Sequence, residues 1–156
     1  MSSTDVVIVE KKAEKVNITP YRQQSDATRP VSFITEAEVG AMAEVARRMR
    51  DGERNELLIL VTFQCALRIS ETLQITKQRR QIIDGKHRLF ILGKGNKPRI
   101  ISIPEVLSYR LGDYIGRHNL GDTERLFPIT RQRAWRIIKL CAEKAGIQRR
   151  VYKSIR

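Results

Sequence analysis

The apolar positions of residues 36–50 recur with the spacing of one helix face, and they are Val39, Met42, Ala43 and Ala46. Thr35, followed by Glu36 and Glu38, is typical of a helix start, where a threonine side chain caps free amides and acids favour the first turn. Residues 51–52, Asp-Gly, are expected to end this helix. The pattern therefore predicts an amphipathic helix over 36–50 with its apolar face in the core.

A second helix is predicted over residues 53–66, whose nearly continuous apolar side chains favour a central position. Residues 70–75 predict a fresh short helix with Ser70 as its candidate cap. Arg68 then lies at a junction between helices, where backbone amides and side chains gather and suit an anion. A buried guanidinium needs a partner, so either an internal carboxylate or an incoming anion must neutralise it.

The pattern changes after residue 76 to that of a small antiparallel sheet. Residues 88–92 and 99–103 are typical of two strands, and 81–83 supply a third. Between the first two lies the stretch Gly-Lys-Gly-Asn-Lys-Pro at 93–98, which predicts a turn.

The chain returns to helix after Pro104, over residues 105–116. Thr130 is expected to cap a last helix that runs through Ala145 and stops at Gly146. The side chains predicted to face inward are Trp135, Ile138, Cys141 and Ala142. The predicted fold class is α+β, mostly helical, with helices packed around a small antiparallel three-stranded sheet. Residues 1–31 are expected to be a flexible N-terminal tail, and 32–156 the domain.

Charge narrows the choice of partner. The 156 residues hold 30 Lys and Arg against 17 Asp and Glu, a net charge of +13 that favours a polyanion. No apolar run is long enough to cross a bilayer, and the N-terminus lacks the pattern of a signal peptide. Nucleic acid is therefore the expected partner, and a cytoplasmic, DNA-associated protein without a membrane partner is the expectation.

Cysteine and histidine add no metal chemistry to this picture. Cys65 and Cys141 both lie in apolar helical contexts, typical of small core residues in a reducing compartment. His87 and His118 lack the spacing of metal ligands. No metal site is predicted.

Two motifs carry a resemblance to a known family. They are "ALRISE" at residues 66–71 and "LGKGNKPRIISIP" at 92–104, and they are followed by a helix that ends in glycine before Lys-Ser-Ile-Arg at 153–156. In this order they resemble the catalytic domain of the tyrosine recombinases, the phage integrase family. The resemblance covers roughly residues 32–156 and makes this region a partial catalytic domain of that kind.

The resemblance implies a reaction that needs neither metal nor nucleotide, so no cofactor is expected. A tyrosine hydroxyl cleaves a DNA phosphodiester and forms a 3′-phosphotyrosine link, which a later step reverses. Two arginines suit the phosphorane-like transition state, because each presents a planar fork of donors to the non-bridging oxygens. A lysine on a hairpin protonates the leaving 5′ oxygen.

Carried over residue by residue, Arg68 resembles the first clamp arginine and Arg156 the second. Lys94 resembles the hairpin general acid, and Lys97 is a neighbouring candidate because the register of the turn stays open. Glu71 resembles the acid that orients this region of the site.

Further residues are assigned more loosely. Lys153 stands where the family most often has histidine, and the resemblance gives it a part in proton transfer. Arg99, Arg131 and Arg133 are candidate contacts to DNA backbone phosphates.

Simpler interpretations stand beside these. Arg68 and Glu71, three residues apart, also suit an internal salt bridge, which is compatible with phosphate binding. Lys94 and Lys97 equally fit solvated charges of a turn. Trp135 is expected in the core and not as a platform for base stacking.

None of the tyrosines follows Arg156, and they are Tyr21, Tyr109, Tyr114 and Tyr152. The expectation is a chain that ends before the nucleophile, binds duplex DNA weakly and forms no covalent link alone. The complete form is expected to act in DNA recombination and integration as a homo-oligomer on DNA. A non-catalytic DNA-binding remnant or regulator remains an alternative, as does a basic RNA-binding protein of the ribosomal type.

Overall fold

The computed structural model describes residues 34–147. In this part of the chain the helices are α1 (Glu36–Arg47), α2 (Gly52–Gln64), α3 (Ile69–Thr72), α4 (Glu105–Arg117) and α5 (Arg131–Lys144). The strands are β1 (Arg80–Ile83), β2 (Lys86–Leu92) and β3 (Pro98–Ser102). The predicted α+β fold with a three-stranded antiparallel sheet is confirmed. The tail predicted over 1–31 lies outside the described residues.

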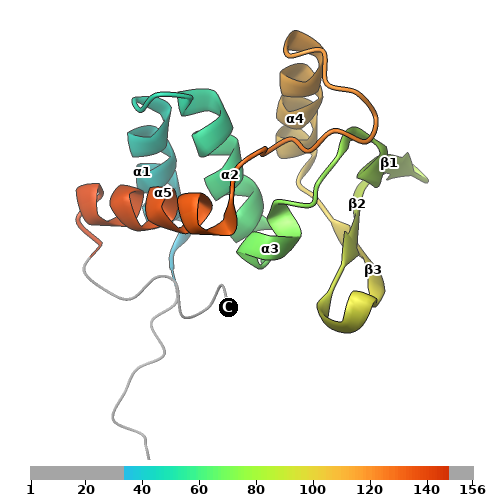
Figure 1. The fold of residues 1–156 in the computed structure, drawn as a ribbon, viewed down its shortest axis with the longest axis horizontal. Coiled ribbons are helices and arrows are strands. Elements are labelled where there is room, and N and C mark those ends of the chain that lie inside the picture. Colours follow the sequence, from blue (N-terminus) through green and yellow to red (C-terminus); the bar gives the residue numbers. More distant parts are fainter. Residues whose placement is uncertain (1–33, 148–156) are drawn as a thin grey trace, which may run out of the picture. The chain divides into compact units, whose positions relative to one another are not determined.

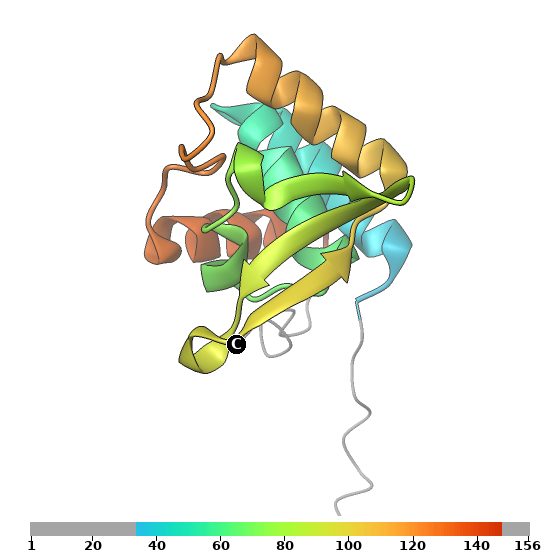
Figure 2. The same ribbon diagram turned by 90° about the vertical axis from the view of Figure 1, so that its right-hand side faces the viewer.

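The helices pack around α2, whose residues 55–62 are all buried. Figure 1 shows α1 and α5 on one side of α2 and α3, and the sheet on the other. Figure 2 looks onto the sheet from that second side, with the helices behind it. No helix among the described residues has the length and apolar character needed to span a membrane.

Helix α1 begins as predicted and ends earlier. Thr35 accepts a hydrogen bond from the Glu38 amide, and the Glu38 carboxylate accepts one from the Thr35 amide at 2.8 Å, which completes a capping box. The helix ends at Arg47 and not at residue 50, because the chain turns tightly into α2. A Cβ at Gly52 would overlap the carbonyl oxygen of Arg47, so this turn requires glycine.

The start of α3 differs from the prediction. Ser70 lies inside the helix, and its N-cap residue is Arg68, which has extended backbone angles of φ −70° and ψ 151°. The helix begins two residues early because Glu71, at its third position, folds back and accepts a hydrogen bond from the Arg68 amide. The expected junction between two helices at Arg68 is present.

The sheet has the order β1-β2-β3, and neither outer strand pairs with a further strand within residues 34–147. In the hairpin formed by β2 and β3, Phe90 pairs with Ile100 and Ile91 with Arg99. Leu89 and Ile91 face the helices and are buried, as the alternation of side chains along a strand requires.

A buried polar contact joins the sheet to α4. The Ser108 hydroxyl lies 2.8 Å from His87 Nδ1 and accepts a hydrogen bond from Arg80 Nη1 at 3.1 Å. The Tyr109 ring meets the His87 ring edge-on, with 5.0 Å between centroids. His87 is thus a core residue that fixes the orientation of the sheet.

The prediction for one core residue of α5 is wrong. Ile138, Cys141 and Ala142 are buried as expected, but Trp135 is 39% exposed. Trp135 lies outside the buried face of this helix, which includes Ala134, Ile137 and Ile138. Cys65, the other predicted core cysteine, is half-buried.

Candidate functional site

Arg68 follows an apolar run and needs a partner for its charge, and the carboxylate of Glu71 is one such partner. Glu71 Oε1 accepts a hydrogen bond from Arg68 Nη1 at 3.2 Å, and Oε2 accepts one from the Arg68 amide at 2.8 Å. Arg99 Nη2, from β3, also donates to Oε2 at 3.0 Å. We call these three residues the Glu71 cluster. The Glu71 side chain is 3% exposed, and those of Arg68 and Arg99 are 47% and 43% exposed.

The local backbone explains how Arg68 reaches this position. Helix α2 ends at Gln64, and Ala66 takes a left-handed conformation with φ 50°. The chain turns there, and Leu67 is buried. Arg68 follows in extended conformation at the start of α3, so its backbone amide and its guanidinium both reach the Glu71 carboxylate.

Lys94 lies in the tight turn between β2 and β3. The turn closes with a hydrogen bond of 2.9 Å from the Gly93 amide to the Lys97 carbonyl oxygen. Gly95 has φ 72°, a left-handed conformation that glycine adopts at little cost. Lys94 is thereby presented on an exposed tip beside the Glu71 cluster.

A single cleft of about 1320 Å³ lies between these elements and α5. Its lining includes four cationic residues, namely Arg68, Lys94, Arg131 and Arg136. The lining also includes Glu71, Gln74, Gln132 and Trp135. Within residues 34–147, Lys94, Arg131 and Arg136 form no ion pair with a carboxylate, while Glu71 is already paired. The cleft is therefore cationic and suits an anion.

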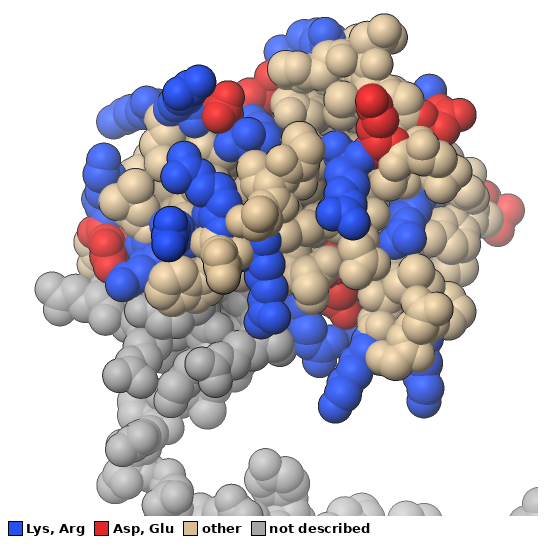
Figure 3. All heavy atoms as spheres, viewed as in Figure 1, with Lys and Arg blue, Asp and Glu red and all other residues tan. Residues whose placement is uncertain are grey.

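The first turn of α5 adds to the positive electrostatic potential of the cleft. Thr130 caps the helix and accepts a hydrogen bond from the Arg133 amide at 3.2 Å. The helix start points its partial positive charge toward the cleft wall formed by Thr130 and Arg131. Figure 3 shows Lys and Arg side chains outnumbering acidic ones over α5 and toward α3 on this face.

The structure brings together some of the predicted site residues. Arg68, Lys94 and Glu71 line one cleft, and Arg131 lines it as well. Lys97 and Arg133 are exposed and are not part of its lining. Lys153 and Arg156 lie outside the described residues, so their roles stay predictions.

Sequence reasoning missed two features of the site. Arg99 was expected only at DNA phosphates, whereas it pairs with Glu71, 28 residues away in the chain. Trp135 was expected in the core, whereas it lines the cleft one helical turn after Arg131. The spacing of Arg131 and Trp135 was a readable signal for a shared face, but no local pattern connects Arg99 with Glu71.

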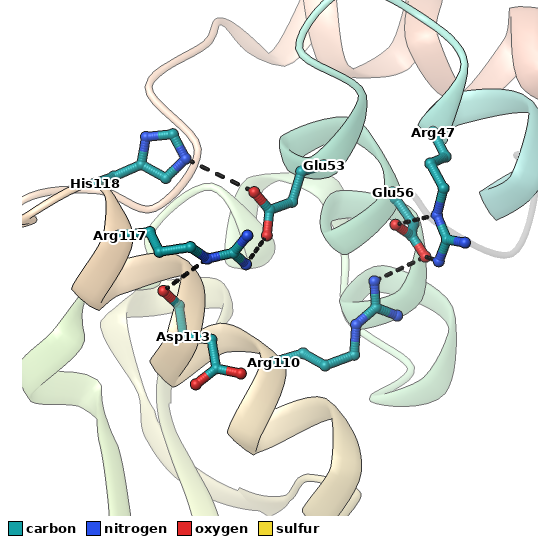
Figure 4. Close-up of polar contacts among 7 residues, drawn as sticks. All are labelled: Arg47, Glu53, Glu56, Arg110, Asp113, Arg117 and His118. Carbon is teal, nitrogen blue, oxygen red and sulfur yellow. Dashed lines mark hydrogen bonds and ion pairs between the residues drawn. The ribbon is translucent and has the colours of Figure 1, made fainter.

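A second buried carboxylate lies among the helices. Glu56 is 5% exposed and accepts hydrogen bonds from Arg47 Nη2 at 2.6 Å and Nε at 3.0 Å. Arg110 Nη2, from α4, lies 2.8 Å from the same carboxylate. We call Arg47, Glu56 and Arg110 the Glu56 cluster, shown in Figure 4. It ties α1 and α4 to α2.

Burial and pairing act in opposite directions on the pKa of Glu56. Burial alone would raise this pKa, but hydrogen bonds from Arg47 and Arg110 and the charges of both arginines outweigh it, so the pKa is lowered. Burial raises the pKa of the Cys65 and Cys141 thiols to about 11, so neither is a nucleophile at neutral pH. Among the described residues, no three His, Cys, Asp or Glu side chains gather as metal ligands.

Comparisons with known proteins show the family to which the chain belongs. Residues 32–155 match the model of the phage integrase family. The chain is 31% identical over 127 residues to the tyrosine recombinase XerA of Pyrococcus furiosus, covering 74% of this chain and 42% of that protein. It is 30% identical over 106 residues to the tyrosine recombinase XerD of Shewanella oneidensis, covering 61% and 35%.

Solved structures show the same fold. A crystal structure of XerA recombinase superposes with a TM-score of 0.62 at 22% identity, over 78% of this chain and 46% of that one. XerH recombinase bound to a palindromic difH substrate, in a post-cleavage complex, gives a TM-score of 0.64 at 20% identity, over 81% and 40%. The chain belongs to the phage integrase family, the tyrosine recombinases. It spans less than half the length of these relatives.

Proposed function

We propose that the chain is the part of a tyrosine recombinase that binds duplex DNA and supplies Arg68 and Lys94 to strand cleavage and rejoining. The observation that carries the proposal is the convergence of Arg68 and Lys94 on one cationic cleft. A phosphodiester is a single negative charge with two non-bridging oxygens, which matches a forked guanidinium beside an ammonium group.

In the proposed reaction, a base outside residues 34–147 takes the proton of a tyrosine hydroxyl. The tyrosine oxygen then attacks the phosphorus, and the bond to the 5′ oxygen breaks. Arg68 neutralises the charge that grows on the non-bridging oxygens. Lys94 gives a proton to the leaving 5′ oxygen, which departs as a hydroxyl group. Glu71 holds the Arg68 guanidinium in place through its 3.2 Å contact, so the donor fork is oriented before DNA arrives.

The nucleophile is proposed to come from outside residues 34–147. Of the two tyrosines in this range, Tyr114 is buried in α4, and burial raises its pKa. Tyr109 is exposed on the same helix but does not line the cleft. Assembly of several copies on DNA, which would bring such groups together, belongs to the same proposal.

Binding of the chain to labelled duplex DNA, measured by fluorescence anisotropy over a series of salt concentrations, tests the proposal. Arg68→Ala is expected to weaken binding about threefold or more and to lower the salt slope by about 0.9, the loss of one phosphate contact. Arg48→Ala removes an equal charge from the exposed end of α1, away from the cleft, and is expected to change neither. Equal effects of both variants, or a clear preference for RNA at matched salt, would contradict the proposal.

A nicked duplex that traps covalent intermediates separates binding from chemistry. The chain alone is expected to give no covalent adduct on a denaturing gel, since Tyr109 and Tyr114 do not line the cleft. Tyr21 and Tyr152 both precede Arg156, whereas the family resemblance places the nucleophile after it. An adduct would show that the nucleophile has been misassigned. A purely DNA-binding role is the second candidate, and the same observation about the tyrosines favours it. Lys94→Ala in an active complex separates the two, because a binding module does not need an acid at that position.

A further inference from the structure

We propose that Arg99 is a positioning residue, which holds the β2–β3 hairpin and its Lys94 beside Arg68 through the shared carboxylate of Glu71. The inference rests on the proposed function, because it concerns how that site is assembled. It differs from the prediction that Arg99 contacts DNA phosphate directly.

The first support is the way the carboxylate is shared. Arg68 is the N-cap residue of α3 and Arg99 lies in β3, and they reach the two oxygens of one side chain that is 3% exposed. A carboxylate so deeply buried needs compensating charge, and each arginine supplies part of it. Because both ion pairs end on Glu71, the position of β3 and that of the Arg68 guanidinium depend on each other.

The second support is the short connection from Arg99 to Lys94. Arg99 pairs with Ile91 on β2, and Pro98 pairs with Leu92, so the strand pairing is fixed up to the turn. The next residue, Gly93, bonds to Lys97 at 2.9 Å and begins the turn that carries Lys94.

Gly93 also lies directly against the Glu71 cluster. A Cβ built on Gly93 would lie 3.7 Å from Glu71 Oε1, so the base of the hairpin rests on the carboxylate itself. Beyond this base, residues 94–99 are all exposed. The ion pair of Arg99 is therefore the contact best placed to stop the hairpin from swinging away from α3.

The planar shape of the guanidinium group explains why arginine suits position 99. The guanidinium presents several donors in a plane and pairs with a carboxylate while its stem lies along the sheet. A lysine keeps the charge but offers a single donor point, so Arg99→Lys should preserve part of the contact. Arg99→Met keeps much of the stem and removes the charge.

Amide hydrogen exchange of the full chain tests the inference without DNA. In Arg99→Met, exchange of the amides of residues 91–93 is expected to speed up about fivefold or more. The reason is that the hairpin loses the partly exposed ion pair that holds it against α3 and opens more often. Arg99→Lys should restore at least half of the protection on a logarithmic scale. Amides of α2, such as that of Leu58, serve as the internal reference and should keep their wild-type rates.

Two controls make the test specific. Arg88→Met removes the same charge from β2, where the side chain bonds to Ser102 and not to the cluster, and should leave residues 91–93 unchanged. In a Glu71→Gln background, Arg99→Met should add little further exchange, because its partner is already lost. Equal loosening by Arg88→Met, or an undiminished effect without Glu71, would overturn the inference.

Salt-dependent DNA binding separates positioning from direct contact. Because a loosened hairpin also displaces Lys94, the comparison is made in a Lys94→Ala background. Under the inference, Arg99→Met leaves the salt slope of that variant unchanged, whereas loss of a phosphate contact made by Arg99 itself would lower it by about 0.9. A lowered slope with an unchanged hairpin would overturn the inference and return Arg99 to the role of a phosphate contact. If wild-type protein fails to bind duplex DNA, the proposed function fails, while the exchange result still decides whether Arg99 anchors the hairpin.

Discussion

The Glu56 cluster and the Glu71 cluster look alike and differ in their surroundings. Each has a glutamate with a side chain no more than 5% exposed, held by two arginines from different elements. At Glu56, Arg47 also lies 3.4 Å from Glu44, so two acids balance the two arginines. At Glu71 one acid serves two arginines, and the cleft beside it is lined by Lys94, Arg131 and Arg136, which form no ion pair within residues 34–147. A buried ion pair therefore becomes informative about function only when the charge around it is counted.

The largest expected effect comes from breaking the Glu56 cluster. Glu56→Gln should lower the free energy of unfolding by about 2 kcal/mol, because Arg47 and Arg110 lose the charged partner that joins α1 and α4 to α2, while both keep some contact with solvent. Urea unfolding followed by circular dichroism measures this loss. Glu44→Gln, at an exposed position in the same network, should cost no more than about 0.5 kcal/mol. A loss below about 1 kcal/mol for Glu56→Gln would mean that the buried pair contributes little.

The same substitution at Glu71, in the wall of the cleft, should affect stability less and DNA binding more. Glu71→Gln should lower the free energy of unfolding by about 1 kcal/mol, because the glutamine side-chain oxygen can still accept the hydrogen bond of the Arg68 amide at the start of α3. It should also tighten non-specific binding to duplex DNA about twofold to fivefold, because a negative charge leaves the cleft wall.

Glu56→Gln is the matched control for this binding effect. Both variants raise the net charge by one, and only the location of the change differs. Anisotropy at a temperature where both proteins are folded compares them. Equal tightening by the two variants would show that total charge, and not the cleft, governs binding.

The smallest expected effect is a difference in acid sensitivity. Pairing lowers the pKa of Glu56 in the folded protein below the ordinary value of 4.5. The stabilisation is therefore present above that value and is lost as the pH falls through the lower folded pKa. Between about pH 5 and about pH 3, the urea midpoint of the wild type should fall more than that of Glu56→Gln. Parallel curves for the two proteins would contradict this assignment.

Much of the fold was predictable because the signals are local. The apolar face of α1, the alternation in β2 and the threonine caps at residues 35 and 130 each depend on neighbours within four residues. The start of α3 was wrong by two residues. Serine is the better capping residue by type, yet the carboxylate of Glu71 reaches back and satisfies the Arg68 amide instead.

The site was predictable in part for a related reason. The resemblance supplied Arg68, Glu71 and Lys94, and the structure places all three on one cleft. The contact of Arg99 with Glu71 depends on how the hairpin folds back onto α3, which no local pattern encodes. The exposure of Trp135 was missed because apolar spacing on a helix does not tell a buried face from the wall of a cleft.

Within residues 34–147 the outer edges of β1 and β3 pair with no further strand, which has a consequence for the behaviour of the protein at high concentration. Such edges can recruit strands from other molecules and start aggregation. Here β1 has only four residues and β3 five, and β3 opens with Pro98, which has no amide hydrogen to offer. Copies of the chain also repel one another through the net charge of +13. Short length, a missing donor and this repulsion are expected to oppose the growth of the sheet into a fibre.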